Sequence, residues 1–133
     1  MRKALLLAVV VLGWAVAARA LDLPFGVTIG GYAAKDEGRA DGAGVIKDAV
    51  DPTAEVVIDA KADMIILNIF AANDDGSPKD GAQPAVIVMQ GKNKARLDET
   101  MDKKPLADGL YRMNAVAGEK TAVVIFKVTK GTK

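Results

Sequence analysis

The apolar residues of this chain come in short runs that Gly, Pro, Asn and Asp interrupt. After residue 20, no long segment keeps the 3.6-residue period of an amphipathic helix. Several runs instead alternate between apolar and polar residues, which is the period of a strand with one buried face. In the clearest run, residues 54–61, one face carries Ala54, Val56, Ile58 and Ala60. The pattern predicts an all-β fold.

Turn-forming residues separate the predicted strands at intervals of about 8 to 12 residues, as in antiparallel sandwiches. The predicted strands are residues 26–33, 45–46, 54–61, Met64–Ala71, Ala85–Gln90, 94–101, Gly109–Ala117 and 121–128. Segment 94–101 also has the four-residue apolar spacing of a helix turn, but its alternation favours a strand. We therefore predict an antiparallel β-sandwich of seven or eight strands, formed by a single domain over residues 21–133.

The N-terminal residues 1–20 have the features of a secretory signal peptide. Two basic residues precede an uncharged apolar stretch, residues 4–18, and residues 18–20 (Ala-Arg-Ala) match the small-residue cleavage pattern. The stretch is shorter than the roughly 20 residues of a spanning helix. We expect cleavage before Leu21, a periplasmic or extracellular location, and no membrane span in the mature chain.

Composition excludes several classes of function. Removing the three basic residues of the predicted signal from the 18 Lys and Arg leaves 15, against 17 Asp and Glu. The mature chain thus lacks the basic balance expected for a nucleic-acid partner. There is no His or Cys, so thiol nucleophiles, histidine-based triads and imidazole or thiolate metal sites are ruled out. We predict that the chain is not an enzyme.

One loop collects hard oxygen ligands within eight residues: Asn73, Asp74, Asp75, Ser77 and Asp80. Calcium takes six to eight oxygens, so this loop is a candidate Ca²⁺ site. The spacing does not match an EF-hand, because no Glu closes a 12-residue loop. The alternative is a solvated turn, since the same residue types favour turns.

Four methionines, Met64, Met89, Met101 and Met113, offer thioether sulfur, the soft ligand for Cu(I) that remains when His and Cys are absent. They lie on separate predicted strands, and methionine is also an adaptable core residue in a chain with few aromatic residues. The sequence favours core packing, and a copper site would need at least three of the sulfurs to converge.

Carboxylate pairs such as Asp98 with Asp102, or Asp59 with Asp63, have the composition of a glycosidase acid and nucleophile. With 17 acidic residues in the chain, such pairs also arise by chance, and the mature chain has no Trp to form a sugar platform. The sequence does not favour a hydrolase.

The segment Pro-Leu-Ala-Asp-Gly-Leu-Tyr, residues 105–111, and the strand Val-Ile-Phe-Lys-Val, residues 124–128, resemble the last two strands of secreted bacterial immunoglobulin-like or fibronectin-like domains. The resemblance implies a tyrosine corner, in which Tyr111 packs at the end of the sandwich and its hydroxyl bonds to nearby backbone. The periplasmic copper-resistance sandwiches are similar in size and in this ending. Their copper site uses histidines, so the resemblance implies that Cu(II) binding is lost here.

Apolar residues also occupy the second faces of two predicted strands: Val123, Ile125, Ile65, Leu67 and Ile69. Uncovered, they would form a patch that marks an interface with another protein or between copies of the chain. Alternatively a loop or the N-terminal segment 21–27 covers them. We expect an exported, non-catalytic β-sandwich that acts as a protein-binding or structural module, with no cofactor. The alternative is a periplasmic metal-handling protein, using Ca²⁺ or Cu(I).

Overall fold

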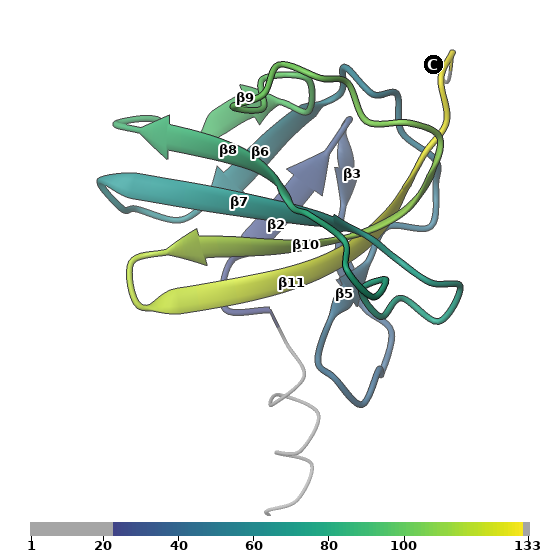
Figure 1. Ribbon diagram of the computed structural model, residues 1–133. Helices are drawn as coiled ribbons and strands as arrows, with labels where there is room; N and C mark the ends of the chain where they lie inside the picture. The colour runs from purple at the N-terminus through teal and green to yellow at the C-terminus, as the bar shows by residue number, and fades with distance from the viewer. Residues whose placement is uncertain (1–22, 132–133) are drawn as a thin grey trace, which may run out of the picture.

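The computed structural model describes residues 23–131, which form ten β-strands and no α-helix (Figure 1). The strands build two packed sheets, which confirms the predicted all-β sandwich. They are β2 (Gly26–Ile29), β3 (Tyr32–Ala33), β4 (Lys35–Asp36), β5 (Gly44–Val45), β6 (Glu55–Asp59), β7 (Met64–Ala71), β8 (Ala85–Gln90), β9 (Lys94–Arg96), β10 (Gly109–Ala117) and β11 (Lys120–Val128). The predicted signal peptide, residues 1–20, lies outside the described residues.

The larger sheet has six strands in the order β4-β5-β11-β10-β7-β8. The predicted strands 109–117 and 121–128 form a hairpin, β10 with β11, in unbroken register from Gly109 opposite Val128 to Ala117 opposite Lys120. Its tight turn uses Gly118 at a φ of 64°, a left-handed conformation that glycine adopts without a steric penalty. β7 pairs with the other side of β10, and β8 forms one edge of the sheet.

The short strand β5 departs from the antiparallel prediction, because it runs parallel to β11. It does not lie at the sheet edge, because β4 pairs outside it. The glycine-rich segment 35–44 contributes Lys35 and Asp36 at its start and Gly44 at its end to strands. The two-residue strand β4, together with β3 of the smaller sheet, raises the strand count to ten, above the predicted seven or eight.

The smaller sheet has four strands in the order β3-β2-β6-β9. Segment 26–33, predicted as one strand, is a hairpin, because Gly30 and Gly31 both have positive φ, 61° and 88°. Segment 94–101 is a strand only as far as Arg96. There the Arg96 amide donates to a Glu99 carboxylate oxygen (2.7 Å) and the Glu99 amide donates to the Arg96 carbonyl (3.0 Å), which closes a turn.

The chain crosses between the two sheets on both sides of the sandwich. On one side, β3 continues directly into β4, and the linking Ala34 donates its amide to the Val27 carbonyl of β2 (2.8 Å). On the other side, the segment between β8 and β9 passes from the larger sheet to the smaller one. The Gly91 amide still donates to the Asp63 carbonyl, next to β7 (2.9 Å), whereas the Asn93 carbonyl already accepts the Ile58 amide of β6 (2.9 Å). The sheets are therefore joined covalently at both edges.

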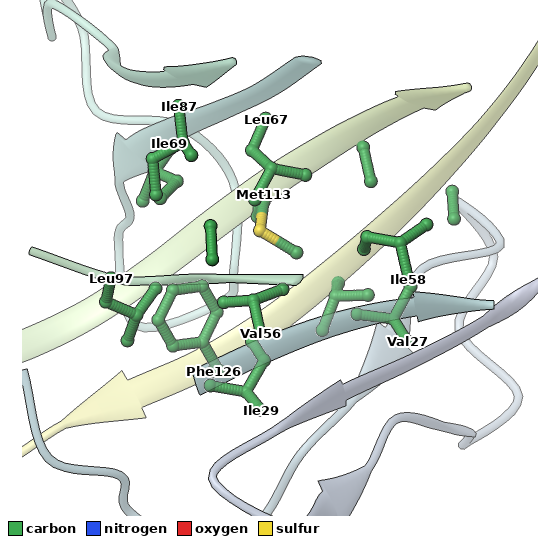
Figure 2. Packing of buried hydrophobic residues seen from close by; sticks show 14 of the residues in the cluster. Val27, Ile29, Val56, Ile58, Leu67, Ile69, Ile87, Leu97, Met113 and Phe126 are labelled. Carbon is green, nitrogen blue, oxygen red and sulfur yellow. The ribbon is translucent and has the colours of Figure 1, made fainter. Parts of the chain in front are cut away.

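The core lies between the sheets and consists of aliphatic residues with one central phenylalanine (Figure 2). The smaller sheet and the turn after β9 contribute Val27, Ile29, Val56, Ile58 and Leu97, and the larger sheet contributes Leu67, Ile69, Ile87, Met113 and Phe126. All are essentially inaccessible to solvent. Their removal from water is the main favourable term in folding a chain without disulfides.

Tyr111 makes the contacts that a tyrosine corner requires. Its hydroxyl donates to the Ala107 carbonyl, four residues upstream, at 2.6 Å. Its ring stacks on that of Phe126, with the centroids 5.8 Å apart and the planes 25° from parallel. Tyr111 thus links the segment before β10 to the core.

The prediction for β7 is wrong about which of its faces is the outer one. Ile65, Leu67 and Ile69 were assigned to a second face, but they are buried in the core. The residues that point outward are the even-numbered ones, from Met64, which is 43% exposed, to the half-buried Ile66, Asn68 and Phe70. Asn68 explains why the even-numbered residues point outward, since its side-chain amide is easier to solvate on the outer face than in the dry core.

Candidate functional site

The outer face of the six-stranded sheet carries apolar side chains at matched positions of three neighbouring strands. Ile66 of β7 lies opposite Val88 of β8 on one side and opposite Val116 of β10 on the other. Val88 is 40% exposed, and Ile66 and Val116 are half-buried. Met64 and Val86 extend this row along β7 and β8. We call these five residues the apolar strip.

Two amides border the apolar strip. Asn68 of β7 lies directly opposite Asn114 of β10, and both side chains are half-buried. Within residues 23–131 neither side chain makes a hydrogen bond to another protein group. Their donors and acceptors therefore remain available to water or to a partner on this face.

The opposite end of the same face is covered by a loop. Ile125 of β11 points outward, yet it is only 5% exposed. Gly76, in the loop between β7 and β8, lies so close that a Cβ atom built on it would be 2.5 Å from the Cδ1 of Ile125 and 3.1 Å from an Arg39 nitrogen. The loop explanation for the second-face residues is therefore confirmed at Ile125.

Side chains from two other segments hold this loop in place. Asp41 accepts two hydrogen bonds of 3.0 Å from the Arg39 guanidinium and one of 2.9 Å from Arg112 Nη1. Arg112 also donates to the Gly76 carbonyl (3.1 Å), and Arg39 donates to the Asp75 carbonyl (2.8 Å). We call Arg39, Asp41, Gly76 and Arg112 the loop clamp.

The loop clamp has a defined electrostatic character. Hydrogen bonds from Arg39, and then from Arg112, hold the pKa of the Asp41 carboxyl well below its ordinary value, and burial opposes this only in part. The bond to Asp41 also raises the pKa of the Arg39 guanidinium. The nearby Asp75 carboxylate also raises the pKa of Arg39, so two arginines lie among two carboxylates at this end of the sheet.

The loop predicted to bind Ca²⁺ is organised as a turn that uses its own oxygens. The Asp75 carboxylate accepts the Ser77 amide (2.9 Å) and hydroxyl (2.6 Å), and these bonds lower the pKa of Asp75. The side-chain amide nitrogen of Asn73 donates to the Ser77 hydroxyl and to the Pro78 carbonyl. Asp74 and Asp80 make no hydrogen bond or ion pair with other described residues.

Nothing in the described part of the chain gathers three or more acidic side chains in a geometry that could hold a metal ion. The loop from Asn73 to Asp80 therefore lacks a preformed carboxylate cluster. Calcium binding here remains a prediction from the sequence.

The methionines lie in two different environments. Met89 and Met113 are completely buried, whereas Met64 and Met101 are exposed, with Met101 at 71%. The two buried residues flank β7 from opposite sides and at different levels, since Met89 pairs with Ile65 and Met113 with Ile69. This distribution agrees with the core-packing interpretation for Met89 and Met113.

The carboxylates of one predicted pair are engaged locally. Asp98 forms an ion pair with Arg96 at 2.6 Å. Asp102 accepts the Thr100 hydroxyl at 2.7 Å and the Lys104 amide at 3.1 Å, and these bonds lower its pKa. Each carboxylate therefore stabilises the turn that contains it.

The residues of the apolar strip were missed by sequence reasoning because β7 is apolar at almost every position. Alternation alone does not show which of its faces is outside. Asn68 was the available signal, since the one polar residue of this strand indicates that the even-numbered residues point outward. The loop clamp joins residues up to 71 positions apart, such as Asp41 and Arg112, and no local pattern indicates it.

Residues 23–131 contain no helix long and apolar enough to cross a membrane. No protein-family model matches the chain, and a search of curated proteins finds no match either. The functional argument therefore depends on the geometry of the sheet and its loops.

Proposed function

We propose that the chain is an exported, non-catalytic module that binds another protein through the apolar strip of its six-stranded sheet. The observation that carries this proposal is the row in which Ile66 lies between Val88 and Val116, on a face that bears no charged side chain at those positions. Contiguous apolar surface of this kind marks interaction sites on soluble proteins.

The ends of the face support the same proposal. At one end, the loop between β7 and β8 covers Ile125 and the loop clamp holds it there. At the other end, no described segment is hydrogen-bonded across the apolar strip. Asn68 and Asn114 add polar groups beside the apolar surface, as in the mixed composition of protein interfaces. Hydrogen bonds from a partner to these amides would fix its orientation on the sheet, in addition to the apolar area that it buries.

The proposal is tested by placing a photo-crosslinking amino acid at Val88 in the chain produced in its native host. We expect defined adducts at this position, identified by mass spectrometry of the crosslinked band. The matched control is the same amino acid at Lys94, which is exposed on the outer face of the smaller sheet.

A second probe at Val116 extends the test across the strip. Adducts with one partner at both Val88 and Val116, and none at Lys94, would support the proposal. Equal labelling at all positions, or adducts at Lys94 alone, would overturn it.

A further inference from the structure

The strand β8 is the edge of the six-stranded sheet and has backbone groups that point away from its only ladder partner, β7. The Val86 carbonyl points outward, because it accepts the Met101 amide at 2.8 Å. Backbone groups of alternate residues in a strand point the same way, so those of Val88 and Gln90 also face outward. Among the described residues, no backbone group donates to or accepts from them on that side.

The exposed part of β8 has none of the usual features that protect a sheet edge. Its sequence, Ala-Val-Ile-Val-Met-Gln, contains no proline and no charged residue. Its register with β7 continues without a bulge from Ala85 to Gln90. Natural edges without such protection pair readily with another extended chain.

A groove of about 430 Å³ lies beside this edge. It is lined by Ile87, Val88, Lys92, Ala95, Arg96, Asp98, Glu99 and Lys103. Arg96 is neutralised by Asp98, and a carboxylate oxygen of Glu99 accepts the Arg96 amide. Lys92 and Lys103 form no ion pair with any described residue. Two ammonium groups are therefore available to an acidic ligand in the groove.

Lys103 has an unusual backbone for its residue type. Its φ is 60°, and it is the one non-glycine residue with positive φ in the described chain. The buried Thr100 holds this turn, since its carbonyl accepts the Lys103 amide (2.9 Å) and its hydroxyl donates to Asp102 (2.7 Å). Glycine would occupy the position at lower cost, so a lysine there is consistent with a use for its side chain.

We propose that the edge of β8 binds an extended, acidic segment of a partner protein as an added strand. The segment pairs with the outward backbone groups of Val88 and Gln90, and its carboxylates lie against Lys92 and Lys103. The inference rests on the proposed protein-binding function and names the chemistry of the partner. Strand addition of this kind obtains affinity from backbone hydrogen bonds and specificity from side chains.

One two-fold pairing of β8 with a second copy of the chain is disfavoured. A two-fold pairing of β8 with itself, centred on Val88, would place Gln90 of the second copy opposite Val86. The outward carbonyl of Val86 is already bonded to Met101, so the turn would have to open. A separate segment can instead begin at Val88 and extend toward Lys92.

The test uses ¹⁵N-labelled chain after export and two blocked synthetic peptides, one of alternating Glu and Val and one of alternating Lys and Val. We expect the acidic peptide to shift the backbone resonances of β8 and to slow hydrogen exchange of the Val88 and Gln90 amides. The basic peptide should leave them unchanged.

Two further variants separate backbone pairing from charge. An acidic peptide that is N-methylated at every residue should not bind, because methylation removes all of its backbone donors. The double variant Lys92→Glu, Lys103→Glu should bind the unmodified acidic peptide roughly tenfold more weakly. Lys127→Glu, an exposed lysine on β11, is the matched control and should bind normally.

Equal binding of the basic peptide or of the N-methylated peptide would overturn the inference, as would resonance shifts confined to another strand. An oligomer that Val88→Pro dissociates would show that a second copy occupies the edge, which also overturns it. Adducts at Val88 and Val116 without peptide binding would leave the proposed function standing and reject the added strand. Peptide binding without those adducts would reject the apolar strip instead.

Discussion

Gly76 lies directly over Ile125, and there is no space between them for even one additional methyl group. The contact joins the loop between β7 and β8 to the outer face of β11. It covers an apolar residue that would otherwise be exposed, and it leaves the apolar strip as the open part of the face.

Gly76→Ala should lower the free energy of unfolding by about 2 kcal/mol, because it combines a left-handed φ of 87° with a clash against Ile125. Gly81→Ala is the matched control in the same loop, with a φ of 74° but no atom within 4 Å. Urea unfolding should give a smaller loss for Gly81→Ala. Equal losses would mean that backbone strain alone, and not the contact with Ile125, limits the position.

Asp41→Asn should destabilise the chain by about 1 kcal/mol at neutral pH, allowing for solvent screening of a side chain that is 34% exposed. Since the folded pKa of Asp41 is lowered, its charge stabilises the fold above the unfolded pKa of about 3.9, and this is lost as the pH falls through the folded value. The difference in unfolding free energy between the two proteins should shrink with acid. A difference that stays constant from pH 7 to pH 2 would contradict this.

Tyr111→Phe removes the hydroxyl that donates to the Ala107 carbonyl and leaves the stacked ring in place. We expect a loss of about 1 kcal/mol in thermal or chemical unfolding, because the carbonyl loses its partner. Tyr32→Phe is the control, since Tyr32 is 37% exposed and its hydroxyl makes no bond within the described residues. Similar effects of both substitutions would argue against the corner.

Ile87 and Val88 are neighbours on β8 that point to opposite faces, Ile87 being 1% and Val88 40% exposed. Ile87→Ala should lower the free energy of unfolding by about 2 to 5 kcal/mol, because it opens a cavity in the core. Val88→Ala should cost well under half as much while weakening partner binding. Urea titration of both variants checks the register of β8, and the reverse order of effects would show that the strand is shifted by one residue.

The fold class could be predicted from the sequence because alternation and turn residues are local signals. The two-residue periods of β6 and β11 indicated their buried faces correctly, with Val56 and Phe126 inside. The turn at Gly118 marked the central hairpin. The Gly30–Gly31 turn was missed, because apolar residues on both sides resembled a single strand.

The sequence by itself determined the all-β architecture, the absence of His and Cys chemistry, and the residues able to form the tyrosine corner. Only the tertiary structure decided which face of β7 is outside, because a strand that is apolar at nearly every position has no preferred phase until its neighbours are placed. It also decided the loop clamp, in which Asp41 meets Arg112 across 71 residues, and the open edge at Val88. Contacts between distant segments depend on the order of the strands within each sheet, and the apolar periodicity of a single strand does not specify that order.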